Sequence, residues 1–408
     1  MKASSLRLGG ARARAATPRR SNARAAAAGR RDGPAGLAFV DVGAADAAER
    51  LRQAIFPSEG GDGLGVFYAD LASYVDADAV NAAYDALNRF HALPKDEKAR
   101  VHSGLNRCNR GWVPLHEEPA YDAGAVSFVE AFDLGSEAAN HAYQEDGVGA
   151  NAWPSESCVP GFRSNVYGLY DDLTAAGEAF YGLLEEALGV SGAGALDAAP
   201  YLGGRLGARA SHNSVAARSV MRLLRYPPVS EAEAAARALR DGVVGISAHT
   251  DFECFTFIHS SGPGLQVQRG RDGPWIDVPP PPPLRSGTRE GHTPSTAFVV
   301  LVGDVLERWT NGMAPAARHR VVRPAGPARR SIVRFNGLEN GTRIRPLPPF
   351  DPCVTGTPLL HPETTQGEHL AAAAQAAMAN LDELVRDGRV PPPMVLPGSD
   401  GPAVKNCL

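Results

Sequence analysis

Between residues 219 and 335 the chain reads as a series of short β-strands joined by turns, with no helical segment among them. The segments are rich in β-branched and aromatic residues and are separated by turns, a pattern that predicts an all-β sandwich or barrel. A proline-rich stretch, 279–295, interrupts the series and is expected to be a surface insertion. The predicted strands are Ser219–Tyr226, Val243–Ile258, Gly264–Gln268, Trp275–Val278, Thr296–Val302, His319–Arg323 and Ser331–Phe335.

The rest of the chain mixes helices with strands, so the expected fold class is mainly β with flanking helices. A helix that begins near Ala79 should stop at Pro94, because proline cannot continue a helix. Residues 191–214 are rich in Gly, Ala and Ser and are expected to form a loop. The other predicted elements are strands at 38–42 and 64–69 and helices at 47–55, 162–188 and 367–385.

These segments predict four parts of the chain. Residues 1–36 form a leader, and 37–214 form an α/β region with a long helix. The β-rich core occupies 215–345, and a helix with a tail occupies 346–408. The chain has 408 residues, which is enough for a sizeable core and one large or two medium domains.

Composition excludes several classes of protein. The chain is 44% hydrophobic and 21% charged, an ordinary soluble mixture. It has no apolar run of about 18 residues, so no membrane-spanning helix is expected. Its five cysteines are scattered and form no C-x-x-C motif. This pattern indicates a reducing compartment and argues against a disulfide framework or a zinc site.

The first 31 residues differ from the rest, because they contain Lys2 and eight arginines but no acidic residue. This composition is typical of an organelle transit peptide, and we expect import into a chloroplast or a mitochondrion. The alternative is a basic tail on a cytoplasmic protein. Removing these nine basic residues leaves 32 against 45 acidic ones, a net charge of −13. So acidic a body is not expected to bind nucleic acid.

His249 and Asp251 occupy alternate positions of one predicted strand, and His319 begins another. Alternate strand residues point the same way, so both side chains would face the interior, where His319 could join them. Two imidazoles and one carboxylate are the ligand set that holds non-haem Fe(II) and leaves positions open for O₂ and a co-substrate. The same residue types also bind zinc, so this set alone does not name the metal.

Two other His-x-acid sequences show that the motif can occur by chance. They are His116-Glu117-Glu118 and His361-Pro362-Glu363, and we interpret both as surface loops. His249-x-Asp251 is favoured because it alone lies in the strand-rich part of the chain, with an ordered partner downstream in His319.

Arg329 and Ser331 share one face of a predicted strand. Arginine offers a planar fork to a carboxylate, and serine adds a hydroxyl donor. An arginine that faces the interior would be costly without an anion. The alternatives are that Arg329 faces solvent and that Arg330 or Arg334 has this role. Tyr226 could add a phenol donor or could be a core aromatic residue.

Many ordered segments between about residues 37 and 345 resemble the Fe(II)/2-oxoglutarate-dependent dioxygenases, and the closest group is the isopenicillin N synthase-like class. Glu253 departs from the family pattern, because it stands where glycine is common, and Pro315-Ala316-Ala317 replaces a common Lys-Ser. The matching segments are Phe90–Lys98, Arg110–Pro114, Glu130–Gly135, Trp153–Pro154, Pro160–Phe162, Ala248–Phe257, Gly264–Val267, Val302–Gly312, His319–Val322 and Arg329–Ser331.

The resemblance implies a double-stranded β-helix (jelly-roll) core with flanking helices. It also implies that O₂ and 2-oxoglutarate are used to oxidise a small organic substrate, with release of succinate and CO₂. Hydroxylation is the default outcome, desaturation and ring closure are variants, and ascorbate is expected to support activity. The implied iron ligands are His249, Asp251 and His319, and the implied 2-oxoglutarate residues are Arg329, Ser331 and Tyr226.

Two other functions stay open. An oxidase of the same fold uses iron and O₂ without 2-oxoglutarate, and Arg329-x-Ser331 does not exclude it because some such relatives keep the pair. A non-catalytic relative would keep the barrel and lose turnover, although the presence of all three ligand residues weighs against it. The substrate and the oligomeric state are also left open by these residues.

Overall fold

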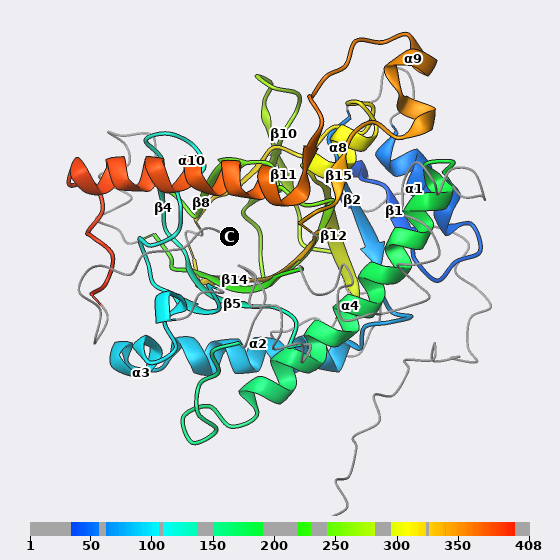
Figure 1. Ribbon diagram of the computed structural model, residues 1–408. Coiled ribbons are helices and arrows are strands. Elements are labelled where there is room, and N and C mark those ends of the chain that lie inside the picture. The colour runs from blue at the N-terminus through cyan, green and yellow to red at the C-terminus, as the bar shows by residue number, and fades with distance from the viewer. Residues whose placement is uncertain are drawn as a thin grey trace, which may run out of the picture.

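The computed structural model describes residues 34–56, 63–105, 109–137, 151–190, 219–229, 243–281, 295–323, 326–338 and 340–395. These residues form two facing β-sheets, with helices packed on the outer face of the larger sheet (Figure 1). Residues 1–33 of the predicted leader, the predicted loop 191–214 and most of the predicted insertion 279–295 lie outside the described residues.

The larger sheet has eight strands in the order β1-β2-β12-β9-β14-β6-β5-β3. Every neighbouring pair is antiparallel except the parallel pair β1–β2. The sheet takes strands from both sides of residue 215, so the predicted α/β region and the predicted core share one sheet. The strands are β1 (Phe39–Asp41), β2 (Val66–Asp70), β3 (Gly111–Val113), β5 (Glu130–Leu134), β6 (Met221–Tyr226), β9 (Phe255–Ser260), β12 (Ala297–Val302) and β14 (Arg329–Asn336).

The smaller sheet has four antiparallel strands in the order β11-β10-β13-β8. Two short strand pairs, β4–β7 and β15–β16, complete the β structure of the described residues. The predicted fold class, a mainly β jelly-roll with flanking helices, is confirmed. The remaining strands are β4 (Val126–Ser127), β7 (Val243–Val244), β8 (Ile246–His249), β10 (Leu265–Gln268), β11 (Trp275–Val278), β13 (His319–Val321), β15 (Arg343–Ile344) and β16 (Thr364–Thr365).

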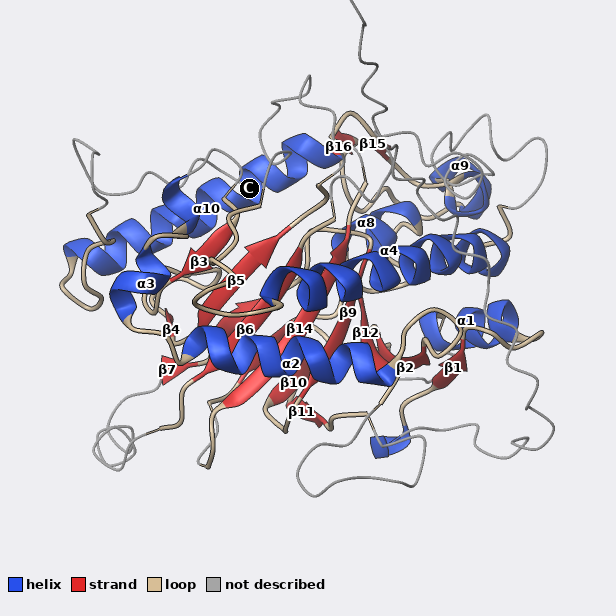
Figure 2. Ribbon diagram, turned by 90° about the horizontal axis from the view of Figure 1, so that it is seen from below, coloured by secondary structure: helices blue, strands red, loops and turns tan. Residues whose placement is uncertain are grey.

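Helices α2 and α4 lie across the same face of the larger sheet (Figure 2), and α10 lies on the opposite side of the sheets (Figure 1). No described helix is both long and apolar enough to span a bilayer. The α-helices are α1 (Ala47–Ile55), α2 (Ala77–His91), α3 (Lys95–Ala99), α4 (Phe162–Ala187), α8 (Asp304–Trp309), α9 (Pro352–Thr355) and α10 (Gln366–Arg386), and the 3₁₀ turns are Pro34–Gly36, Ser103–Leu105 and Pro348–Phe350.

Successive side chains of the larger sheet point to opposite faces, so the sheet has one apolar core under the helices and another between the two sheets. On β9, Phe255 and Phe257 point toward the helices and pack against Phe180 of α4, with ring centroids 4.6 Å and 5.5 Å from it. Ile258 points the other way, into the core between the sheets. Because both faces are covered, central strands such as Ala297–Val302 are buried throughout, which explains their unbroken apolar sequence.

A register shift between β8 and β13 prepares the site between the sheets. His319 pairs with His249, but Val321 pairs with Ile246, so four residues of β8 span the same length as three of β13. The extra residue is a β-bulge, which re-aims the side chains next to it. As a result both Ile246 and His249 face the space between the sheets.

The predicted strand Val243–Ile258 is wrong as a single element. The structure divides it into β7, β8 and β9, with a turn after His249. The carbonyl groups of Asp251 and Glu253 accept hydrogen bonds from the backbone N–H groups of Asp304 and Val305, at 2.8 Å and 3.2 Å. These contacts with the start of α8 satisfy the backbone of the turn, and strand periodicity does not reveal them.

A buried polar cluster surrounds Glu130 on the helix-facing side of β5. Glu130 Oε1 accepts hydrogen bonds from Lys98 Nζ at 2.5 Å and from Trp112 Nε1 at 2.8 Å. His91 Nδ1 lies 3.0 Å from Glu130 Oε2. Burial raises the pKa of Glu130, but His91 and Lys98 outweigh burial and lower it to about 2. The carboxylate therefore stays charged inside the protein.

Candidate functional site

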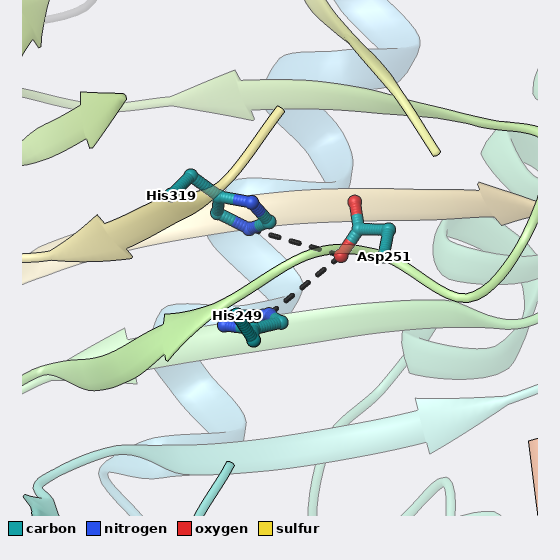
Figure 3. Close-up of side chains that lie close together, drawn as sticks. All are labelled: His249, Asp251 and His319. Atoms are coloured by element: carbon teal, nitrogen blue, oxygen red, sulfur yellow. Dashed lines mark ion pairs between the residues drawn. The ribbon is translucent and has the colours of Figure 1, made fainter. Parts of the chain in front are cut away.

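His249, Asp251 and His319 meet between the two sheets (Figure 3). His249 ends β8, His319 begins β13, and Asp251 lies in the turn two residues beyond β8. The two Nε2 atoms, of His249 and His319, lie 3.6 Å and 3.7 Å from Asp251 Oδ1. All three ligand atoms lie within 4.8 Å of one another. An ion placed between them could contact all three at ordinary ligand distances of about 2 Å.

Backbone carbonyl groups fix the orientation of both imidazoles. His249 Nδ1 lies 2.8 Å from the carbonyl oxygen of Ser247, and His319 Nδ1 lies 3.0 Å from that of Ala317. A carbonyl oxygen only accepts, so each Nδ1 carries the proton and donates it. The lone pair of each Nε2 is then free to face a metal ion, the arrangement that metal-binding histidines adopt.

Electrostatics also suit a divalent cation at this place. Burial, followed by the neighbouring His319, lowers the pKa of His249 to about 3, so the imidazole is a neutral ligand at pH 7. Burial raises the pKa of Asp251. A bound cation would reverse that effect by supplying the positive charge that a buried carboxylate lacks. The donor set, two neutral imidazoles and one carboxylate, fits Fe(II).

Arg329, Ser331 and Tyr226 lie together on the same inward face of the larger sheet, and all three are buried. Tyr226 of β6 pairs with Arg329 of β14, and the guanidinium carbon lies 5.0 Å from the ring centroid. Arg329 Nη1 donates to Ser331 Oγ at 2.7 Å, and its Nε donates to the carbonyl oxygen of Gly262 at 3.3 Å. Burial raises the pKa of Tyr226 to about 12, so the phenol keeps its proton.

No carboxylate among the described residues forms an ion pair with Arg329. Burial lowers the pKa of this guanidinium, because the surroundings of the side chain disfavour its positive charge. A buried arginine with free donors and no anion beside it is arranged to receive a carboxylate. The three predicted residues are therefore brought together in the way that binding of a distal carboxylate requires.

The alternatives Arg330 and Arg334 alternate with Arg329 on β14 and so point to the other face of the sheet. Arg334 Nη2 donates to Thr174 Oγ1 of α4 at 2.9 Å, and its guanidinium lies 4.2 Å from the ring centroid of Tyr170. Arg334 thus packs among the helices. Of the arginines considered, Arg329 is the one on the inward face, between the two sheets.

The interpretation of residues 116–118 as a surface loop is wrong. Glu117 and Glu118 are only 5% and 2% exposed. Glu117 lies 3.0 Å from His102 Nε2, whereas His361 pairs with Glu307 at 2.9 Å. Within the described ranges, the His249 site is the single cluster of three metal-binding groups, so neither of the other His-x-acid sequences forms one.

A polar network beside His249 was missed by reasoning from the sequence. The ring of Tyr121 stacks on the His249 imidazole, with centroids 4.5 Å apart and an interplanar angle of 20°. The Tyr121 hydroxyl donates to Glu118 at 3.1 Å, and Glu118 in turn binds Arg222. Tyr121 and Glu118 lie outside helices and strands, where no periodicity marks a residue. Arg222 did carry a signal, because it is a charged residue in an apolar strand.

Two family models match the chain. The model of the 2OG-Fe(II) oxygenase superfamily matches residues 217–337, the segment that contains His249, Asp251, His319 and Arg329. The model described as the N-terminal region of non-haem dioxygenases in morphine synthesis matches residues 44–156. Together the two models cover more than half of the chain. The first contains the four central strands of the larger sheet, and the second contains β2, β3 and β5.

Curated relatives and solved structures agree with these models. The chain is 33% identical over 261 residues to the 2-oxoglutarate-Fe(II) type oxidoreductase hxnY of Emericella nidulans, and this match covers 62% of this chain and 64% of hxnY. It is 28% identical over 274 residues to the 2-oxoglutarate-dependent dioxygenase citB of Monascus ruber, covering 65% of this chain and 73% of citB. The chain thus spans slightly less than two thirds of hxnY.

Similar folds include a full-length Neurospora crassa protein solved in complex with alpha-KG, with a TM-score of 0.60, 21% identity, and coverage of 84% of this chain and 96% of that protein. A putative 2OG-Fe(II) oxygenase family protein of Caulobacter crescentus has a TM-score of 0.61 and 25% identity, with coverage of 83% and 98%. These folds bear out the jelly-roll, and the family models contain the segments that hold the site. The chain belongs to the Fe(II)/2-oxoglutarate-dependent dioxygenase family.

Proposed function

We propose that the protein is a non-haem Fe(II)- and 2-oxoglutarate-dependent dioxygenase that hydroxylates a small organic molecule. One O₂ molecule supplies one oxygen atom to the substrate and one to succinate, while 2-oxoglutarate loses CO₂ and provides two electrons. One observation carries this proposal. The same interior contains a complete set of iron-binding side chains and Arg329, a buried cation that forms no ion pair with a carboxylate among the described residues.

Each residue of the site has a separate task. His249, Asp251 and His319 would hold Fe(II), which supplies the activation of O₂ when it is bound. Three protein ligands leave other coordination positions open for the co-substrate and O₂.

Arg329 would anchor the distal carboxylate of 2-oxoglutarate through its fork. Ser331 Oγ, which lies 2.7 Å from Arg329 Nη1, and the protonated phenol of Tyr226 would add hydrogen bonds to that carboxylate. Ascorbate would support activity by keeping the iron reduced. Neither a nucleic acid nor a membrane is part of this proposal.

The rival functions use this site less completely. An iron oxidase that needs no 2-oxoglutarate would leave Arg329 as a buried cation without an anion, which is costly. A non-catalytic relative has no need of three converging ligands, nor of the two carbonyl contacts that orient the imidazoles. The dioxygenase reaction is the function that gives every one of these groups a task.

The metal assignment can be tested with His319→Ala and a matched control, His361→Ala, which alters a histidine paired with Glu307 away from the site. After reconstitution with Fe(II) under anaerobic conditions, His319→Ala should retain little iron and release no succinate, while its unfolding curve stays cooperative. The control should bind iron as the wild type does. A His319→Ala protein with full iron content and full activity would refute the metal assignment.

A further inference from the structure

We propose that Glu118, Asp133 and Arg222 form a closed polar wall beside the metal ligands, through which the enzyme selects uncharged substrates over carboxylates. This inference rests on the proposed function, because it concerns the molecule that is oxidised at the site. It names a substrate class and two specificity-determining residues, Glu118 and Asp133, which lie outside the ligand set and outside the 2-oxoglutarate residues.

Both carboxylates bind one guanidinium group. Arg222 Nη1 and Nη2 each donate to one oxygen of Glu118 at 2.7 Å, and Arg222 Nε donates to Asp133 Oδ1 at 2.8 Å. Glu118 is 2% exposed and Asp133 is 6% exposed. A guanidinium recognises a carboxylate through paired N–H groups at its end or along its side. In Arg222, Glu118 already occupies the end of the guanidinium and Asp133 occupies its side.

This wall lies beside the metal ligands. Arg222 and Tyr226 are four residues apart on the same face of β6, which places them about 13 Å apart along the strand. Tyr121 connects the wall to the metal site, because its hydroxyl donates to Glu118 while its ring stacks on His249. The wall therefore stands next to His249 and well away from Arg329, which is reserved for the co-substrate.

The charge of the wall is already balanced without a substrate anion. The positive charge of Arg110 also acts on Asp133, and its guanidinium lies beside Gly135. Two positive groups, Arg222 and Arg110, therefore accompany the two negative groups. Burial still holds the pKa of Asp133 above its ordinary value, so negative charge is costly at this place. A substrate carboxylate would bring a third negative charge to the wall, and like charges brought close together weaken binding. An uncharged substrate avoids that cost.

Matched pairs of amides and acids test this selection. Benzamide, nicotinamide and indole-3-acetamide are compared with benzoate, nicotinate and indole-3-acetate near pH 7, where only the acids are charged. Succinate release is measured for the purified protein with Fe(II), 2-oxoglutarate, ascorbate and O₂. We expect the most effective amide to stimulate release about tenfold more than its acid partner. In Glu118→Gln, which frees the end of Arg222, that ratio should fall about tenfold.

Glu117→Gln is the matched control. It makes the same change at the neighbouring buried position, but Glu117 contacts His102 and the backbone N–H of Met394 instead of Arg222. Its amide-to-acid ratio should equal that of the wild type. Thermal unfolding checks the fold of both variants, and Asp133→Asn replaces Glu118→Gln if the latter does not fold.

Three results would overturn the proposal: acids that act as strongly as amides, no stimulation by any amide, or an unchanged ratio in the folded wall variant. A different result would count against the proposed function itself. If the wild type neither binds 2-oxoglutarate nor releases succinate under any condition, the dioxygenase assignment fails before the substrate question arises.

Discussion

Replacing Arg329 by methionine should weaken the use of 2-oxoglutarate and stabilise the protein at the same time. Arg329 is 3% exposed, and no carboxylate among the described residues pairs with it. Loss of one partner of a buried charge pair costs roughly 2–5 kcal/mol of binding free energy. This range corresponds to a rise of about 30-fold to a few thousand-fold in the 2-oxoglutarate concentration that gives half-maximal succinate release. In the absence of 2-oxoglutarate, the variant loses a buried cation and should gain about 1–4 kcal/mol of stability.

The assay combines succinate release as a function of 2-oxoglutarate concentration with thermal unfolding in the absence of the co-substrate. Arg330→Met is the control, because Arg330 points to the other face of β14, and its 2-oxoglutarate requirement should stay that of the wild type. A purely structural role for Arg329 predicts loss of stability with an unchanged 2-oxoglutarate requirement. That pair of results would exclude Arg329 from the binding of 2-oxoglutarate.

Three further predictions concern other parts of the chain. The pKa of Glu130 is lowered to about 2 in the folded protein, so the carboxylate contributes about 3 kcal/mol to the free energy of unfolding above pH 4.5, and this contribution is lost as the pH falls from 4.5 to 2. In denaturant unfolding, the stability lost in Glu130→Gln should therefore shrink toward low pH, and a loss that does not depend on pH would contradict this assignment. Gly177→Ala in α4 would place a methyl group 2.5 Å from Asn336 Oδ1 and should cost about 1–3 kcal/mol, whereas Gly182→Ala, with open space around it, should stabilise the same helix by about 0.5–1 kcal/mol; equal effects in denaturant unfolding would argue against this packing. Residues 1–36 fused to a fluorescent protein should direct it to a chloroplast or a mitochondrion, and a diffuse cytoplasmic signal would favour the basic-tail interpretation.

Much of the fold could be predicted from periodicity, because the helices α1, α2, α4 and α10 begin and end within a few residues of the predicted positions. Each has an apolar stripe or a local stop signal, such as Pro94 after α2. Strands β3 and β5 were not predicted as elements, although both join the larger sheet. Their residues are buried by distant partners, since β5 pairs with β6 across about ninety positions of sequence, and local patterns carry no record of such pairing.

The candidate site was predictable where chemistry is concentrated in short motifs, and it was hidden where chemistry depends on tertiary contacts. His249, Asp251 and His319 were expected to converge and do so, although Asp251 lies in a turn beyond the strand. Glu118 was misread because an acidic residue outside a helix or strand is usually solvated. Its burial depends on Arg222, which lies more than one hundred residues away and supplies the charge that the carboxylate needs.

The stoichiometry of the co-substrate reaction tests the dioxygenase function most directly. Purified protein is supplied with Fe(II), O₂, ascorbate and 2-oxoglutarate, and both 2-oxoglutarate consumption and succinate formation are quantified in the wild type and in Asp251→Ala. We expect one succinate for each 2-oxoglutarate consumed, a strict requirement for Fe(II), and loss of both reactions in Asp251→Ala. Succinate formation that persists in Asp251→Ala, or that does not need Fe(II), would contradict the proposed function.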